Sequence, residues 1–145
     1  MAGGRLAKWC ISDSLSDHTA SFFLRQFRLY IRKVEQHYGI TKTRPVYERA
    51  ITDLNDDDSR AMCIEFATME SKLGEVDRAR AIYQHGSQFA DPRKFGDYWA
   101  KWKQFEEMYG NEDTFREMLR IQRSVETANS QVRLTCLLSV GDARR

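Results

Sequence analysis

The chain alternates stretches of helical hydrophobic periodicity with short breaks of glycine or polar residues. In each stretch, apolar residues recur every three or four positions, which places them on one face of an α-helix. The pattern begins with Phe23, Phe27 and Tyr30, and six such stretches succeed one another before residue 127. Only two prolines occur in the chain, and strong helix formers are frequent. The sequence therefore predicts an all-α protein.

The predicted helices pair into three helix–turn–helix units of nearly equal length. Four kinds of position recur at intervals of about 36 residues: a glutamate near the end of the first helix, the glycine that ends it, and an arginine and a large side chain in the second helix. These positions are Glu35, Gly39, Arg44 and Tyr47; Glu70, Gly74, Arg80 and Tyr83; and Glu106, Gly110, Arg116 and Leu119. Such a period is typical of an α-solenoid, whose hairpins bury their apolar faces against their neighbours. We expect three repeats, at about residues 22–54, 58–91 and 95–127.

The two ends of the chain lack this periodicity. Residues 1–20 contain Gly, Ser and Asp without a regular pattern, and we expect them to form a poorly ordered segment. Residues 128–145 are expected to form a C-terminal tail that is helical in part. Between the first two repeats, the acidic stretch NDDDS is interpreted as the negatively charged start of the third helix.

The glutamate and arginine columns suggest ion pairs within each repeat. In an antiparallel hairpin, the end of the first helix lies near the start of the second. The expected pairs are Glu35 with Arg44, Glu70 with Arg80, and Glu106 with Arg116. Partly buried pairs of this kind would orient the hairpins. The alternative is that both columns are solvated helix charges.

Length, charge and cysteine content narrow the class of protein. At 145 residues and 41% hydrophobic content, the chain suits one folded domain. Its net charge is +2, and the excess lies after residue 127, so the repeats do not have the charge of a dedicated nucleic-acid-binding domain. Three cysteines without metal or redox spacing suggest a reducing compartment. No apolar run has the length of a membrane span.

No group of residues in the sequence supports catalysis, a metal site or a cofactor. The stretch GEVDRARAIYQHG, residues 74–86, lacks the second glycine, lysine and hydroxyl residue of a phosphate loop, and its acidic side chains would repel phosphate. We interpret it as the elbow of the middle repeat. His18, His37 and His85 fall in no metal-ligand spacing, and no nucleophile motif is present. We therefore predict a protein that is not an enzyme and has no small-molecule substrate.

Two groups of basic residues could contact an acidic partner or RNA. They are Arg25, Arg28 and Arg32 in the first helix, and Arg93, Lys94, Lys101 and Lys103 before and within the fifth. Clustered cations attract polyanions. The alternative is that both groups are solvated faces, since the repeats are neutral as a whole.

The fifth predicted helix carries an aromatic pattern with two interpretations. Trp99, Trp102 and Phe105 could form a platform on which nucleic-acid bases stack. Their spacing of three residues is that of a packed helix face, and no basic residues alternate with them in a regular code. We expect them to lie in the core.

This aromatic pattern, followed by Glu106 and Gly110, is similar to the first helix of the HAT (half-a-TPR) repeat, and Arg80 with Tyr83 is similar to its second helix. The resemblance extends over roughly residues 22–127. In combination, stretches such as KLGEVDRARAIY and GNEDTFREMLRIQRSV resemble the C-terminal repeats of the Syf-type, crooked-neck-like family of pre-mRNA splicing factors. The tetratricopeptide repeat fits less well, because its period is 34 residues.

The resemblance implies a HAT-repeat α-solenoid that acts as a non-catalytic protein–protein interaction scaffold of the spliceosome. It implies a nuclear location, partners among other spliceosomal proteins of the Prp19-associated complex, and a further role in transcription-coupled DNA repair. Direct RNA binding through the basic helix faces is the alternative. Members of the family are long arrays, so we expect this chain to be a fragment or short isoform. Its first helix would then expose an apolar face that upstream repeats normally cover.

Overall fold

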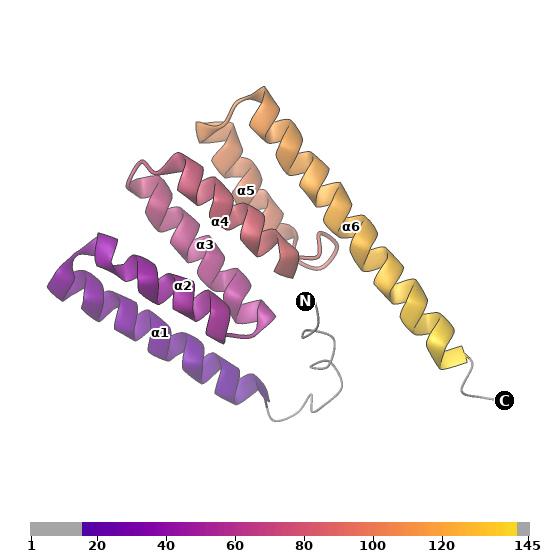
Figure 1. The fold of residues 1–145 in the computed structure, drawn as a ribbon, viewed down its shortest axis with the longest axis horizontal. Coiled ribbons are helices and arrows are strands. Elements are labelled where there is room, and N and C mark those ends of the chain that lie inside the picture. Colours follow the sequence, from indigo (N-terminus) through magenta and orange to yellow (C-terminus); the bar gives the residue numbers. More distant parts are fainter. Residues whose placement is uncertain (1–15, 142–145) are drawn as a thin grey trace, which may run out of the picture. The chain divides into compact units, whose positions relative to one another are not determined.

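The computed structural model describes the backbone of residues 16–141 and the side chains of residues 22–131. All regular secondary structure in this part is helical, which confirms the predicted all-α class (Figure 1). The chain divides into two compact units, Met1–Asp58 and Ser59–Arg145. The boundary between them falls in the first turn of α3 (Asp56–Lys72), next to the start expected for the second repeat.

The first unit contains a helical hairpin. Its helices α1 (Ser16–Tyr38) and α2 (Arg44–Asp53) run antiparallel and are joined by a short 3-10 helix, η1 (Ile40–Thr43) (Figure 1). Gly39 has a φ angle of 90°, a left-handed conformation that glycine adopts without strain. Pro45 lies in the first turn of α2, where its missing N–H leaves no helical hydrogen bond unmade. The buried side chains of this unit include Ile31, Val34, Tyr47 and Ala50.

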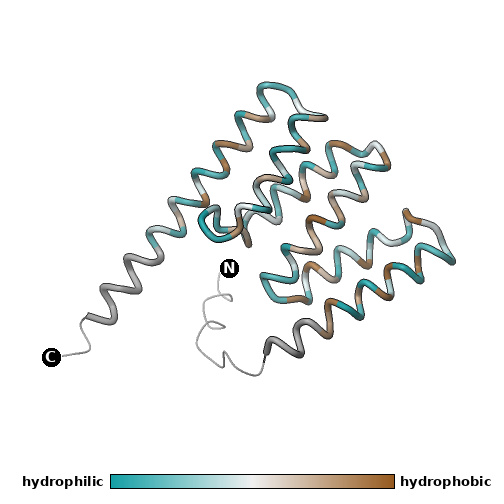
Figure 2. The backbone as a smooth tube through the Cα atoms, turned by 180° about the vertical axis from the view of Figure 1, so that it is seen from behind, coloured by the Kyte–Doolittle hydropathy of each residue, from teal (hydrophilic) through white to brown (hydrophobic). Residues whose placement is uncertain are grey.

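The second unit contains two further hairpins. The first pairs α3 (Asp56–Lys72) with α4 (Val76–Gly86), and the second pairs α5 (Gly96–Tyr109) with α6 (Glu112–Gly141) (Figure 1). A single 3-10 turn, η2 (Ser87–Phe89), follows α4. Apolar positions recur along each of these helices, as the hydropathy colouring shows (Figure 2).

The outermost helices are longer than their hydrophobic pattern predicts. α1 begins at Ser16, within the predicted N-terminal segment 1–20, of which residues 1–15 lie outside the described part. α6 continues to Gly141 through most of the predicted tail. Periodicity marks only the part of a helix that has an apolar face, so it underestimates the length of a helix that extends beyond its packing partner.

Asparagine side chains cap two of the helices. The Asn55 carboxamide oxygen accepts a hydrogen bond from the Asp58 N–H at 2.8 Å, at the acidic start of α3. At the start of α6, the Asn111 side chain accepts from the Thr114 N–H, and the Thr114 hydroxyl accepts from the Asn111 N–H, both at 2.9 Å. These bonds satisfy N–H groups that have no partner within the helix.

The core of the second unit is aromatic. Trp102 is 1% exposed and stacks between Tyr83 and Trp99, with ring-centroid distances of 6.0 and 5.5 Å. The polar atoms of the core have partners: Trp99 Nε1 donates to the Ala90 carbonyl at 3.0 Å, and Tyr98 Oη donates to the Tyr83 carbonyl at 2.5 Å. Trp99, Trp102 and Phe105 are therefore packed inside, as expected, and are not a base-stacking surface.

Gly86, at the end of α4, is closely packed. A Cβ atom there would lie 2.6 Å from Tyr98 Oη and 2.9 Å from Cys63 Cβ. We expect Gly86→Ala to lower the free energy of unfolding by about 1–3 kcal/mol, because a full core absorbs extra volume poorly. Gly96→Ala is the matched control, since a Cβ there would meet nothing within 4 Å. Urea denaturation followed by circular dichroism measures both variants, and equal effects would contradict close packing at Gly86.

Candidate protein-interaction surfaces

A buried ion pair joins the two hairpins of the second unit. Arg80 Nε in α4 lies 2.9 Å from Glu106 Oε1 in α5, and Arg80 Nη2 lies 3.3 Å from Glu106 Oε2. The Glu106 side chain is fully buried and the Arg80 side chain is 20% exposed. Trp102 Nε1 also donates to Glu106 Oε1, at 3.2 Å. Because a forked arginine–carboxylate pair has a narrow geometry, it sets the position of α4 along α5.

The pairing predicted within the middle repeat is wrong. Arg80 bonds Glu106 of the following repeat, not Glu70 of its own. Arg78 lies nearer to Glu70, with 3.9 Å between Nη1 and Oε1. Residues two positions apart point to different sides of a helix, so Arg78 lies near Glu70 of α3 while Arg80 bonds Glu106 of α5. The helix face, rather than closeness to the turn, decides the partner.

The pairing predicted in the other repeats does not form either. In the third repeat, Arg116 bonds Glu112 at 2.5 Å and Asp113 at 3.3 Å, both in the preceding turn of α6. In the first repeat, the Glu35 side chain is exposed, and within the described part of the chain it makes no ion pair with Arg44. The glutamate and arginine columns therefore share a period but do not pair within a repeat.

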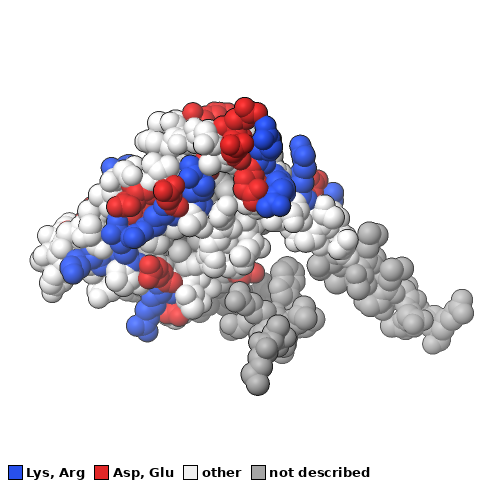
Figure 3. Space-filling view, turned by 45° about the horizontal axis from the view of Figure 1, so that its top comes forward, with Lys and Arg blue, Asp and Glu red and all other residues white. Residues whose placement is uncertain are grey.

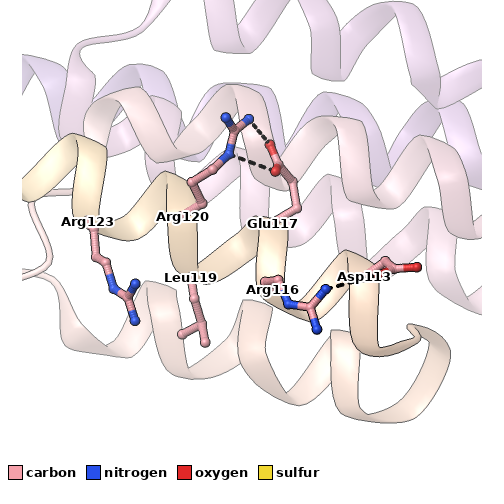
Figure 4. Close-up of a pocket in the computed structure, with 6 residues that line it drawn as sticks. All are labelled: Asp113, Arg116, Glu117, Leu119, Arg120 and Arg123. Atoms are coloured by element: carbon pink, nitrogen blue, oxygen red, sulfur yellow. Dashed lines mark hydrogen bonds and ion pairs between the residues drawn. The ribbon is translucent and has the colours of Figure 1, made fainter.

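The outer side of α6 is a charged surface with a shallow hollow of about 320 Å³. We call it the α6 surface, and its residues are Asp113, Arg116, Glu117, Leu119, Arg120 and Arg123 (Figure 4). Arg120 forms a forked pair with Glu117, at 2.8 and 2.6 Å, and these hydrogen bonds hold the pKa of the Glu117 carboxyl below its usual range. Arg123 lies beside the hollow and makes no ion pair with any residue in the described range (Figure 4).

An apolar groove of about 580 Å³ runs between α1 and α2 in the first unit. Its lining is Phe23, Phe27, Tyr30, Pro45, Val46, Arg49, Asp53 and Leu54. Phe23 and Tyr30 are 56% and 58% exposed, far more than is usual for large apolar side chains. Arg49 and Asp53 form an ion pair of 3.2 Å. The predicted exposure of an apolar face on the first helix is thus confirmed.

The predicted basic contacts lie at or near the surface of their own units. Of the seven residues, only Arg28 is half-buried and the others are exposed. Arg93 pairs with Glu126 at 3.2 Å, and Lys103 lies 3.9 Å from Glu107. Lys101 and Lys103 are two positions apart and point to different sides of α5. On the face shown in Figure 3, basic and acidic side chains lie side by side.

Buried ionisable groups in α3, α4 and α5 serve packing rather than chemistry. Cys63 is a free thiol that is fully buried, and burial raises its pKa from 9.0 to about 12. Burial likewise raises the pKa of Tyr83 and of Tyr98. A thiol with so high a pKa is a poor nucleophile at neutral pH.

The buried Cys63 thiol should make stability depend on alkaline pH. Its pKa is raised on folding, so it stabilises fully below pH 9 and loses this contribution as pH rises from about 9 toward about 12. By pH 10 we expect a loss of about 1 kcal/mol in the free energy of unfolding. Urea denaturation at pH 7–10 should show a loss that is about 1 kcal/mol larger in the natural chain than in Cys63→Ala, in which the buried Tyr83 and Tyr98 still contribute. An identical slope in both would show that Cys63 ionises equally in the folded and unfolded chain.

Metal and membrane functions find no support in the structure. Within the described residues, no cluster of His, Cys, Asp and Glu could hold a metal ion. None of the helices there combines the length and the apolar character needed to cross a bilayer.

Comparison with known proteins agrees with the repeat architecture. Residues 15–141 match the family described as pre-mRNA-splicing factor Syf1/CRNKL1 C-terminal HAT repeat. The chain is 58% identical over 100 residues to pre-mRNA-splicing factor syf1 of Aspergillus fumigatus, an alignment that covers 69% of the chain and 12% of that protein. It is 55% identical over 107 residues to pre-mRNA-splicing factor SYF1 of Homo sapiens, which covers 73% of the chain and again 12% of the relative.

The matches cover most of this chain but a small share of each relative. Pre-mRNA-splicing factor syf1 homolog of Drosophila melanogaster, 54% identical over 109 residues, is likewise matched over 12% of its length. The family consists of helical repeats, in agreement with the prediction that the chain is not an enzyme. The chain belongs to the Syf1/CRNKL1 C-terminal HAT repeat family.

Proposed function

We propose that this chain is a protein-interaction module of the spliceosome that acts in pre-mRNA splicing in the nucleus. It would bind other spliceosomal proteins of the Prp19-associated complex as a scaffold segment, and through the same contacts take part in transcription-coupled DNA repair. The proposal starts from relatives that are named pre-mRNA-splicing factors and are 51–58% identical to this chain. Identity at this level favours conserved surfaces as well as a conserved fold.

The observation that carries the proposal is the apolar groove of the first unit. Large apolar side chains that stay exposed in a folded unit mark sites where another protein packs. The groove offers Phe23 and Tyr30 as aromatic anchors, a residue class that dominates binding energy in protein interfaces. An ion pair at its rim, Arg49 with Asp53, supplies the polar border typical of such sites.

A pull-down from nuclear extract tests the proposal. The purified 145-residue chain is used as bait, with and without nuclease, and retained proteins are identified by mass spectrometry. Spliceosomal proteins should be retained after nuclease treatment and lost with the groove variant Phe23→Asp/Tyr30→Asp. Leu29→Asp is the matched control, because Leu29 is 54% exposed but does not line the groove. Failure to retain spliceosomal proteins in any arm would overturn the proposal.

Direct RNA binding is the second candidate, through the exposed face of α1 that carries Arg25, Arg28 and Arg32. These residues are spaced three and four apart, so they share one helix face. Loss of the spliceosomal proteins on nuclease treatment, with an RNA affinity that falls steeply as salt rises, would favour this function.

A further inference from the structure

The contact between α4 and α5 provides a template for a contact that α6 could make. α4 and α6 are the second helices of successive repeats, and their positions correspond at an interval of 36 residues. Asp77 and Arg80 of α4 thus correspond to Asp113 and Arg116 of α6. In α4, this arginine reaches the buried carboxylate of Glu106 on the first helix of the next repeat.

Arg116 shares with Arg80 a bond to the aspartate three residues earlier, and it has one more local partner, because its Nη2 bonds the exposed Glu112. Arg80 Nη1 bonds the Asp77 carboxylate at 3.0 Å, and Arg116 Nη1 bonds the Asp113 carboxylate at 3.3 Å. The two arginines differ in how much of the side chain is exposed to solvent. The Arg80 side chain is 20% exposed beneath α5, whereas the Arg116 side chain is 68% exposed. α6 is the last helix that the structure describes, so no later helix there covers Arg116.

We infer that the α6 surface binds the first helix of a HAT-type hairpin from another protein chain, with Arg116 pairing with a glutamate of that helix. The occupant would be an amphipathic helix with the chemistry of α5, namely large apolar side chains followed by a glutamate on one face. Its carboxylate would take the place that Glu106 has against Arg80. An apolar side chain would enter the hollow over Leu119, where Tyr83 of the template contacts Trp102 and Phe105.

Charge on the α6 surface favours a protein helix over a polyanion. Carboxylates of Glu112, Asp113 and Glu117 surround the arginines and would repel a run of phosphates. A single glutamate can instead bond Nε of Arg116 and displace the exposed Glu112 from Nη2, so that it would hold the guanidinium as Glu106 holds that of Arg80 next to Asp77. Arg123, which has no acidic partner in the described range, adds positive charge at the same hollow (Figure 4).

This inference rests on the proposed role in protein binding and assigns one surface and one class of partner to it. The inference concerns α6 alone, and its test uses only the purified chain and a synthetic peptide. The pull-down can therefore succeed through the groove of the first unit while the α6 inference fails, and the reverse can also occur.

The test uses the full chain and a helix-locked peptide of residues 96–109, the sequence of α5. A lactam bridge between Lys103 and Glu107 locks the peptide, because both side chains are exposed and lie one turn apart. Binding is measured by fluorescence anisotropy. We expect Arg116→Glu to weaken binding at least tenfold, and a peptide carrying Glu106→Lys to restore it. The control is Lys101→Glu in the full chain, which makes an equal charge change on α5 and should leave binding of the unmodified peptide unchanged.

Three results would overturn the inference. The first is no binding of either peptide to the chain. The second is binding that Arg116→Glu does not change, which would place the peptide elsewhere, for example on α4 in exchange for the chain's own α5. The third is a single-stranded RNA oligonucleotide that binds through Arg116 while the peptide does not, which would assign the surface to nucleic acid.

Discussion

Arg80→Met is expected to lower the free energy of unfolding by about 3–5 kcal/mol. The Glu106 carboxylate that Arg80 neutralises is fully buried, and after the substitution Trp102 Nε1 would remain as its donor. An uncompensated buried charge costs this much because the interior solvates it poorly. Methionine fills a volume near that of the arginine stem, so the effect reports the charge rather than a cavity. Urea denaturation at pH 7 followed by circular dichroism gives the value.

Arg116→Met is the matched control for this prediction. Arg116 holds the equivalent repeat position, but its partners Glu112 and Asp113 are 85% and 86% exposed. Exposed pairs contribute little, so we expect a change below about 1 kcal/mol. The double variant Arg80→Met/Glu106→Gln should recover part of the loss, because it removes the buried charge as well. Similar losses for Arg80→Met and Arg116→Met would refute the role assigned to burial.

Trp102→Ala should lower the free energy of unfolding by about 3–5 kcal/mol as well, for a different reason. The indole is 1% exposed, stacks on Tyr83 and Trp99, and donates to Glu106. Its removal would leave a cavity in the aromatic core and take a hydrogen-bond donor from a buried carboxylate. Thermal and urea denaturation of the variant and the natural chain measure the loss.

Tyr109→Ala separates burial from aromatic character. Tyr109 also belongs to α5 and contacts Phe105 with its ring, at 5.5 Å between centroids, but it is 46% exposed. We expect it to cost about 1 kcal/mol or less, since much of its surface is in water in the folded state. A loss as large as that of Trp102→Ala would mean that the core extends to the end of α5.

Much of the fold can be predicted from residue spacing. The hydrophobic period locates the helices and their apolar faces, and the recurrence of Gly39, Gly74 and Gly110 locates the turns. The physical reason why glycine is required at each of these positions cannot be predicted from the spacing. Gly74 has a positive φ of 83°, whereas Gly110 has a φ of −90° and is small because a Cβ would collide with the Glu106 side chain. Equal positions in a repeat thus meet different steric demands.

The candidate surfaces are predictable in part. Phe23 and Tyr30 lie on the apolar face that the periodicity assigns to the first helix, and the structure shows that these two side chains are exposed. The basic residues were identified by closeness in sequence, which does not reveal that Lys101 and Lys103 point apart or that Arg93 is held by Glu126 from a distant part of the chain. In the sequence, Arg120 and Arg123 extend the line of Arg116 and indicate a face that could meet a partner, and the correspondence of Asp77 with Asp113 is a further signal for the α6 surface.

The sequence by itself determined that this chain is helical, that its helices pair at a period of about 36 residues, and that Trp99, Trp102 and Phe105 face inward. These properties depend on the spacing of side chains along one helix, which sequence states directly. Tertiary structure alone decided that Arg80 reaches forward to Glu106 and that Gly86 has no room for a methyl group. Both depend on which helix faces meet and at what distance. Arg80 and Glu106 are 26 positions apart, and Gly86 and Cys63 are 23 positions apart, so the spacing of residues along one helix does not reveal that they meet.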